Sequence, residues 1–283
     1  MSAIYRGMNQ SKLDAQYDQR TLVPHAGEYM ARWAERSASI IAAKGPETLR
    51  YGEGPNEIML VFGDGPSAGA GAHLHLHGGA WRQLSAGQTA FVASGLLGAG
   101  VPVAVADFSL APAAALGAIV EEVRRAFLCL AERFGSVGVS AHSSGCHLAG
   151  MLLDPAWQES AGVKGALRGL VLASGVYDLE PVRLSARNTY LSLSEEEAAA
   201  LSPHLHLPKG PPPATLLWGD GELDEFQRQS RAFAAALRAA GGEARELVLP
   251  GLNHFDVYDS FAEPGSEVVA AVRALHSPTA AAG

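Results

Sequence analysis

The sequence predicts an α/β domain with a mostly parallel central sheet, helices on both faces of that sheet and a helical extension at the N-terminus. Two observations lead to this prediction. Short apolar runs bounded by glycine or charge recur along the chain, and stretches of helical periodicity separate most of them. Such alternation is typical of βαβ units, whose strands pair in parallel. With 283 residues, 48% of them hydrophobic and 18% charged, the chain can bury the core that such a domain requires.

The expected elements follow from this pattern in chain order. Residues 1–50 are polar and favour helix, and we expect them to cap a pocket in the domain formed by residues 51–277. Apolar runs predict strands at 57–63, 72–79, 101–107, 137–141, 167–175, 214–220 and 244–251. Periodic stretches predict helices at 85–99, 113–134, 144–154, 226–240 and 265–276.

Three further segments have their own signatures. A glycine-rich turn joins the first two predicted strands, so we expect these strands to pair antiparallel at an edge. Residues 176–213 have no strand pattern and predict an excursion over the carboxyl edge of the sheet, where ligands of α/β proteins bind. The small residues of 278–283 predict a disordered tail.

Charge and composition limit the partners that we expect. The formal net charge is −8 and no cluster of Lys and Arg occurs, which argues against nucleic-acid binding. The uncharged stretch between Arg82 and Asp107 is interrupted by Gln, Gly and Pro, so a helix followed by a buried strand explains it better than a membrane span. Two cysteines fit a reducing compartment, and the N-terminus does not read as a signal peptide. We therefore expect a cytoplasmic protein without a membrane partner, and leave open whether it forms a homodimer.

The stretch VGVSAHSSGCHLAG is the strongest chemical signal. A short apolar strand leads directly into Ala141-His142-Ser143-Ser144-Gly145, and a segment compatible with a helix follows. Small residues flank Ser143 because a bulky Cβ would clash in the strained strand-to-helix turn that exposes a nucleophilic serine. Ser144 is the rival nucleophile, but centring the motif on it puts the bulky His142 in a small position. The alternative without catalysis is that Ser-Ser-Gly only caps a helix.

The sequence HGGAW at 77–81 predicts the loop that stabilises an oxyanion. Backbone N–H groups fixed toward the developing charge do this work, and glycines let the backbone approach the substrate. We assign Gly78 and Gly79 as donors, together with the amide of Ser144. His77 then orients the loop. His73, His75 and His77 share one face of a strand and could be read as metal ligands, but no Cys or carboxylate lies nearby in the sequence, so we expect neither a metal nor another cofactor.

A catalytic serine needs a base, and the base needs a carboxylate to orient it. The segment GDGELDEFQRQS follows a predicted strand and offers carboxylates at 220, 222, 224 and 225. The pattern Gly-x-x-Asp favours Asp224, placed just before a helix expected to begin at about Phe226. Asp220 is the second choice and fits a turn at the strand end equally well. The remaining carboxylates, Glu222 and Glu225, are typical of charge at a helix N-terminus.

The segment LPGLNHFDVYDSF places His254 in a loop after the last strand, where a general base can reach the serine. The other candidates are weaker, because His276 lies near the tail and His204 and His206 lie in the excursion. Serine, acid and histidine then end separate strands in the chain order of one known hydrolase arrangement.

These motifs together resemble the kynurenine formamidase (arylformamidase) branch of the α/β-hydrolases. In that branch the motifs read HGG-x-W, GHSAG-x-HL, a loop Asp followed by EF-x-RQS, and a His-Phe pair; here they read HGGAW, AHSSGCHLAG, GELDEFQRQS and NHF. FSLAP, SGVYDLEP and ALSPHL extend the similarity over nearly the whole chain. The sequence departs from the branch at Phe108, where Tyr is usual, at Ser144, where Ala is usual, and in a shortened segment before Phe226.

The resemblance implies an α/β-hydrolase fold and hydrolysis of a small aromatic formamide such as N-formylkynurenine, with Ser143, Asp224 and His254 as the triad. Trp81, His142 and Phe255 are candidate pocket residues, although Trp81 fits core packing as well. The departures bear on the substrate, so a carboxylesterase with the same catalytic groups is the nearest alternative. A catalytically idle ligand receptor on the same scaffold is a more remote one.

Overall fold

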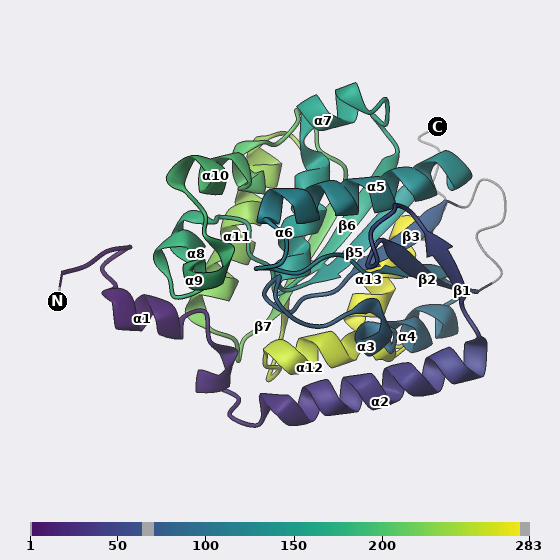
Figure 1. Cartoon of the computed structure of the whole chain (residues 1–283), viewed down its shortest axis with the longest axis horizontal. Helices are drawn as coiled ribbons and strands as arrows, with labels where there is room; N and C mark the ends of the chain where they lie inside the picture. Colours follow the sequence, from purple (N-terminus) through teal and green to yellow (C-terminus); the bar gives the residue numbers. More distant parts are fainter. Residues whose placement is uncertain (1, 64–70, 278–283) are drawn as a thin grey trace.

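The computed structural model describes residues 2–63 and 71–277, and its centre is an eight-stranded sheet in the order β1-β2-β4-β3-β5-β6-β7-β8 (Figure 1). The strands are β1 (Glu47–Arg50), β2 (Ile58–Phe62), β3 (Ala72–Leu76), β4 (Val103–Ala106), β5 (Val137–His142), β6 (Leu167–Ala173), β7 (Ala214–Gly219) and β8 (Ala244–Leu249). From β4 to β8 all neighbouring strands are parallel, as the alternating pattern predicts. The C-terminal tail and most of the glycine-rich turn lie outside the described residues.

The expected pairing of 57–63 with 72–79 is wrong. β2 pairs antiparallel with β1 and with β4, whereas β3 lies between β4 and β5 and is parallel to both. All five residues of β3 are buried, while β2 is only partly buried, so β3 takes a central position with a partner on each side. β1 was not predicted, because its sequence ETLR lacks an apolar run and its residues are largely exposed at the sheet edge.

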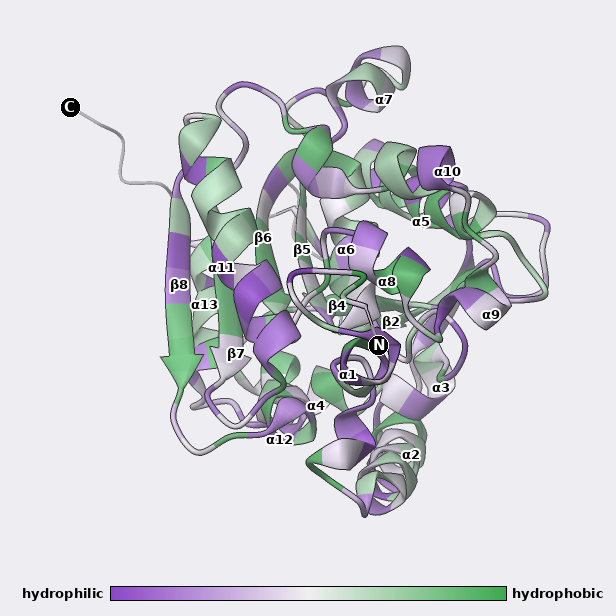
Figure 2. Ribbon diagram, turned by 90° about the vertical axis from the view of Figure 1, so that its left-hand side faces the viewer, coloured by the Kyte–Doolittle hydropathy of each residue, from purple (hydrophilic) through white to green (hydrophobic). Residues whose placement is uncertain are grey.

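Two hydrophobic cores fill the two faces of the sheet, and the strands alternate between them. In β6, Leu170 and Leu172 belong to one core, and Val171 and Ala173 belong to the other. The first core contains α5 (Leu116–Phe134), α6 (Ser144–Gly150) and α11 (Asp224–Ala239). The second core contains α3 (Ala86–Thr89), α4 (Val92–Gly98), α12 (His254–Asp259) and α13 (Glu267–His276). Figure 2 shows β8 at one edge of this arrangement, with α11 and α13 beside it.

The excursion and the N-terminal segment contribute further short helices. Within the described residues, 176–213 contains no strand, as expected, but α8 (Glu180–Leu184), α9 (Asn188–Leu191), α10 (Glu195–Ala200) and the 3₁₀ turn η3 (Pro203–Leu205). The N-terminal segment comprises α1 (Gln10–Ala15), the 3₁₀ turn η1 (Gln19–Thr21) and α2 (Ala26–Lys44). The remaining helical pieces are η2 (Met151–Leu153), α7 (Pro155–Ser160) and η4 (Ser260–Ala262).

Helix α2 runs beneath α3, α4 and α12 along one side of the molecule (Figure 1). Trp33 is buried on this side, and its indole N–H donates to Asp259 at 2.7 Å. Arg32 forms an ion pair with the same carboxylate at 2.6 Å. These contacts attach the start of the chain to a segment near its end.

Candidate active site

Ser143 stands between the end of β5 and the start of α6, in the predicted strand-to-helix turn. Its backbone angles are φ 54° and ψ −124°, in a region that side-chain-bearing residues avoid. Gly145 makes the turn possible, because a Cβ there would lie 2.5 Å from the carbonyl oxygens of Leu76 and His77. The Ser143 N–H donates to the carbonyl of Ala173 on the neighbouring strand β6 at 2.9 Å, which fixes the turn to the sheet.

His254 is in contact with this serine. Its Nε2 lies 3.0 Å from the Ser143 Oγ, a hydrogen-bond distance suited to proton transfer. His254 begins the short helix α12, so it does not lie in a loop as expected. Asn253 caps this helix by accepting from the N–H groups of Phe255 and Asp256, and it thereby fixes the position of the imidazole.

The carboxylate beside His254 belongs to Glu222, not to Asp224, so the sequence prediction of the acid is wrong. The Glu222 Oε2 lies 2.7 Å from the His254 Nδ1. Its Oε1 accepts from the Ser174 hydroxyl at 2.6 Å and from the Gly219 N–H at 2.8 Å. Glu222 is buried, and each of its oxygens therefore has a hydrogen-bond partner.

Asp224 was misplaced because the helix begins earlier than the sequence indicates. Asp224 is the first residue of α11 and is exposed, whereas the prediction started this helix at about Phe226. The second choice, Asp220, is exposed and accepts from the Gly251 N–H at 2.6 Å, as a residue of a strand-end turn does. Glu222 was considered in the sequence only as helix-terminal charge, and its longer side chain gave no signal of its reach.

The loop that begins at His77 packs directly against Ser143. A Cβ on Gly78 would lie 2.9 Å from the Cβ of Ser143, and a Cβ on Gly79 (φ 101°) would lie 2.0 Å from the Gln83 carbonyl oxygen. Over the part of the chain that the structure describes, the N–H groups of Gly78, Gly79 and Ala80 have no acceptor. The N–H of Ser144 opens α6 and lacks an acceptor within that helix. Ala80, which the sequence did not single out, is thus a further donor candidate.

His73 and His75 in β3, and His77 directly after it, each contact neighbouring groups. His73 and His75 lie 2.8 and 2.9 Å from the same hydroxyl, that of Ser140. Burial lowers the pKa of His75 to about 3, so its imidazole is neutral. His77 stacks on Phe108, with ring centroids 4.2 Å apart, and its Nδ1 lies 2.8 Å from the Gly78 carbonyl oxygen. Among the described residues, no three His, Cys, Asp or Glu side chains are grouped as a metal site requires.

The three candidate pocket residues do not lie together. His142 and Phe255 line the cavity that contains Ser143, but the Trp81 side chain is fully buried in the core. The Trp81 indole N–H donates to His147 at 3.2 Å, so Trp81 as a pocket wall is a wrong prediction. Its backbone has a positive φ of 58°. Burial lowers the pKa of His142 well below its ordinary value, so this ring is a neutral wall of the cavity.

A cavity of about 830 Å³ opens onto Ser143 and His254. Side chains from α1, η1 and α2 line one part of it, and residues 185–187, 189 and 190 line another. Its aromatic lining residues are Tyr17, Trp33, Tyr190 and Phe255. A volume of this size is typical of pockets that bind small molecules.

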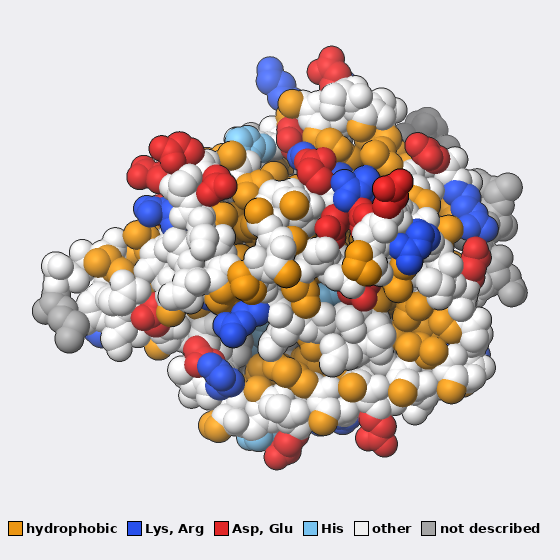
Figure 3. All heavy atoms as spheres, viewed as in Figure 1, with side chains coloured by type: hydrophobic (Ala, Val, Ile, Leu, Met, Phe, Trp, Pro, Cys, Tyr) orange, Lys and Arg blue, Asp and Glu red, His pale blue; other side chains and the backbone are white. Residues whose placement is uncertain are grey.

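Charge on the surface is mixed. Acidic and basic side chains are interspersed over the face shown in Figure 3. None of the described helices combines the length and the apolar character that crossing a bilayer requires.

Comparison with known proteins gives consistent results. A family model described as the alpha/beta hydrolase fold matches residues 73–257. The chain is 29% identical to a kynurenine formamidase of Salmo salar over 75% of this chain and 76% of that protein. It is 25% identical to a kynurenine formamidase of Drosophila melanogaster, with 78% of each chain covered.

Solved structures extend the comparison. A candidate thioesterase from Silicibacter sp. TM1040 superposes with a TM-score of 0.84 at 25% identity, covering 93% of this chain and 99% of that one. An esterase of Pyrobaculum calidifontis superposes with a TM-score of 0.70 at 18% identity, covering 91% and 97%. The second likeness is one of fold alone.

Proposed function

The chain belongs to the α/β-hydrolase fold family and is a hydrolase, and from this premise we propose that it removes the formyl group from an N-formyl arylamine such as N-formylkynurenine. The products are formate and the free arylamine. The observation that carries the proposal is the continuous hydrogen-bonded series from the Ser143 Oγ through His254 to Glu222. Its order is that of a nucleophile, a general base and the carboxylate that orients the base.

In the proposed reaction, the His254 Nε2 takes the Ser143 proton while the Oγ attacks the formyl carbon. Glu222 holds the Nδ1–H and stabilises the imidazolium that forms. The tetrahedral intermediate then collapses: His254 returns the proton to the nitrogen, the C–N bond breaks, and the arylamine leaves. Water, deprotonated by His254, then attacks the formyl ester on Ser143. The bond between the Oγ and the formyl carbon breaks, His254 returns the proton to the Oγ, and formate is released.

The oxyanion of both tetrahedral intermediates requires donors that are already in place. The amides of Gly78, Gly79 and Ser144 are our proposed donors, since they flank Ser143, the first two have no acceptor among the described residues, and the third has none within α6. Each such donor contributes about 10²–10³-fold in rate in enzymes of this type. Their freedom from internal hydrogen bonds means that no bond must break before the substrate binds.

The relatives of the chain and the lining of its cavity both support an aromatic formamide as the substrate. The curated relatives are kynurenine formamidases, and they align over about three quarters of the chain. The aromatic side chains of the cavity offer rings against which an aryl group can stack. We further propose that residues 10–33 cap this cavity, because several of their side chains line it.

A carboxylesterase is the second candidate, because the same groups cleave esters and the structural relatives include esterases. An activity panel separates the two. We expect the wild-type enzyme to hydrolyse N-formylkynurenine and formanilide with higher kcat/KM than p-nitrophenyl acetate. Comparable ester turnover with untouched formamides would reject the formamidase proposal in favour of the esterase.

The role of the serine is tested with a matched pair of variants. Ser143→Ala should abolish hydrolysis and also labelling by a serine-directed fluorophosphonate, because both require the Oγ. Ser160→Ala removes an exposed hydroxyl on α7 that, within the described chain, donates only to the Trp157 carbonyl oxygen. This variant should be labelled as the wild type is. Labelling that survives in Ser143→Ala would contradict the assignment of the nucleophile.

A further inference from the structure

Arg187 is an unusual residue of the cavity wall. Its Nη2 donates to the Tyr17 carbonyl oxygen at 2.7 Å, but its Nη1 is buried and has no hydrogen-bond partner among the described residues. The guanidinium lies over two aromatic rings, with its Cζ 5.2 Å from the centroid of Tyr17 and 5.9 Å from that of Phe226. These contacts hold the cation in place without neutralising it.

Within the described chain, no carboxylate forms an ion pair with Arg187. The two acidic residues that line the same cavity have other partners: Asp18 is paired with Arg20 at 2.8 Å, and Asp14 accepts from the Ala186 N–H at 2.7 Å. Burial lowers the pKa of the Arg187 guanidinium, although an arginine remains charged. The charge of Asp18 also acts on Arg187, but Asp18 is bound to Arg20 and forms no ion pair with Arg187 among the described residues. A buried cation without an ion-pair partner is costly, so an anion that enters the cavity gains a strong partner.

Gln19 supplies a second donor without a partner. It belongs to η1, it is 8% exposed, and its Nε2 has no hydrogen-bond partner in the described chain. Gln19 lines the same cavity as Arg187 and follows Tyr17, whose carbonyl holds the guanidinium, by two residues. Two residues that line one cavity therefore each carry a buried donor with unused hydrogen-bonding capacity.

This donor site lies close to the reacting groups. The Phe226 ring contacts both, with its centroid 4.9 Å from that of His254 and 5.9 Å from the Arg187 Cζ. The Phe226 ring thus lies between the imidazole of His254 and the guanidinium of Arg187. A ligand held at Arg187 needs only a short aromatic spacer to present a second group to Ser143.

We propose that Arg187, assisted by Gln19, binds the carboxylate of the substrate, so that the enzyme selects aryl formamides that carry an acid group. The formamide part of this statement rests on the proposed function. The anion site itself does not, because it follows from the two unused donors and their place in the cavity. Arg187 is then a specificity-determining residue whose fork matches a carboxylate.

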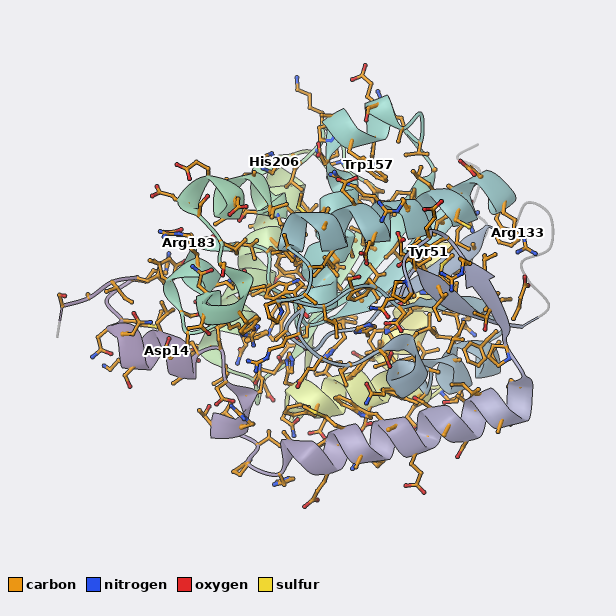
Figure 4. All side chains as sticks on the ribbon, viewed as in Figure 1. Asp14, Tyr51, Arg133, Trp157, Arg183 and His206 are labelled. Carbon is orange, nitrogen blue, oxygen red and sulfur yellow. The ribbon has the colours of Figure 1, made fainter. Side chains whose placement is uncertain are left out.

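The first experiment compares N-formylkynurenine, which carries a carboxylate, with formanilide, which does not. In Arg187→Gln, the ratio of kcat/KM for the acid to kcat/KM for the neutral substrate should fall about 10- to 100-fold, because a charge-assisted pair is lost. Arg187→Lys keeps the positive charge but loses the forked guanidinium, so in this variant the same ratio should fall less. The matched control is Arg183→Gln on the neighbouring helix α8 (labelled in Figure 4), whose guanidinium is held by Glu180 at 2.7 Å and which does not line the cavity.

If kcat/KM falls by the same factor for both substrates, so that their ratio is unchanged, the proposal is overturned and Arg187 has a structural role only. Thermal unfolding of each variant shows whether the fold is intact. Where Arg187→Gln fails to fold, Gln19→Leu takes its place. It should lower the same ratio about 3- to 10-fold, as expected for the loss of one hydrogen bond, and an unchanged ratio would count against the site.

A second readout separates this proposal from the proposed function. Benzoate should inhibit the hydrolysis of p-nitrophenyl acetate by the wild type, and its inhibition constant should be about 10-fold higher for Arg187→Gln. The neutral aniline should have the same inhibition constant for both proteins. Equal inhibition by benzoate in both proteins would overturn the anion site. Untouched formamides together with the expected benzoate pattern would reject the formamidase and retain the anion site.

Discussion

Glu222 reaches His254 from the loop between β7 and α11, and both of its oxygens are engaged there. The hydrogen bonds from Ser174 and Gly219 fix the orientation of the carboxylate before the imidazole approaches. A carboxylate that is both buried and fully bonded holds one tautomer of the histidine, with the proton on Nδ1. In that tautomer His254 presents a free Nε2 lone pair to the Ser143 hydroxyl.

The exchange Glu222→Gln tests this role against the carboxylate that the sequence favoured. We expect kcat to fall by about 10³–10⁴-fold, because an amide can hold the wrong tautomer and cannot stabilise the imidazolium. Asp224→Asn is the matched control and should stay within a factor of about 2, since Asp224 is exposed at the first turn of α11 and only a small helix-dipole effect is lost. Steady-state rates of both variants decide the matter.

The reverse order of effects would restore Asp224 as the acid. Glu222→Asp adds a further check, because shortening the side chain by one methylene should leave activity between that of the wild type and that of Glu222→Gln. Near-UV circular dichroism of each variant verifies that the buried site keeps its packing.

At the scale of single residues, the sequence pointed to Ser143 and His254, which the structure brings into contact, but not to Glu222, the carboxylate beside His254. The elbow is readable because its steric demand for small neighbours is local. The acid is not readable in the same way, since four carboxylates fall within six residues and only the start of α11 decides which of them turns inward. A shift of two residues in a helix start lies within the ordinary uncertainty of such boundaries.

Among the elements, the loop from His77 to Leu84 has the most constrained backbone. Gly79, Ala80, Trp81 and Leu84 all have positive φ. Hydrogen bonds from its surroundings hold this shape: the Ala111 N–H donates to the Trp81 carbonyl at 2.7 Å, and the Tyr190 hydroxyl donates to the Ala80 carbonyl at 3.2 Å. The backbone of Gly79 and Ala80, two residues that line the cavity, is thus held in place by residues other than Ser143, His254 and Glu222.

Gly79→Ala should deform this loop. The added Cβ would lie 2.0 Å from the Gln83 carbonyl oxygen, at a φ of 101° that alanine rarely adopts, so the backbone must move. We expect kcat to fall by about 10²-fold through loss of a proposed oxyanion donor. Gly87→Ala, at an exposed position in α3 with only the Ser85 Oγ at 3.8 Å, should leave kcat unchanged. Equal rates in the two variants would contradict the role of the loop.

The positions of the strands along the chain were largely predictable, whereas the strands that pair with one another in the sheet were not. Apolar runs predicted every strand from β2 to β8, because buried parallel strands need them. The order of the strands depends on contacts far apart in the sequence, so the antiparallel pairing assigned to β3 was wrong. The excursion was recognised from the lack of a pattern, but its four short helical pieces gave no periodicity long enough to detect.

Across the whole molecule, four histidines are buried as neutral rings in the sheet and its adjoining helices. Burial lowers the pKa of His75 to about 3 and that of His147 to about 4, and it places the pKa values of His73 and His142 well below the ordinary value. The unfolded chain regains an ordinary pKa near 6.5 for each. Between these values the unfolded state binds protons that the folded state does not, so the stability is complete above pH 6.5 and declines as the pH falls toward the folded pKa values.

The free energy of unfolding should therefore fall on mild acidification. Each of the four rings contributes about 1.4 kcal/mol per pH unit below pH 6.5, and the total loss at pH 5.5 is about 5 kcal/mol. Urea titrations at pH 7.0 and 5.5 measure this difference. His147→Gln should reduce the pH slope by about a quarter, while His25→Gln, at an exposed position, should not change it. A flat profile over this interval would show that the buried rings do not control acid stability.

The attachment of α2 to the segment around Asp259 also bears on how the protein is made. During translation Trp33 leaves the ribosome before the Asp259 carboxylate and the Tyr258 ring that it contacts, because these are synthesised more than two hundred residues later. Until then this part of α2 lacks the partners that Asp259 and Tyr258 provide, so its apolar side chains are exposed to chaperones and to aggregation. Because α1, η1 and α2 also form part of the wall of the cavity that contains Ser143, this cavity is complete only after His254 and Phe255 have been synthesised.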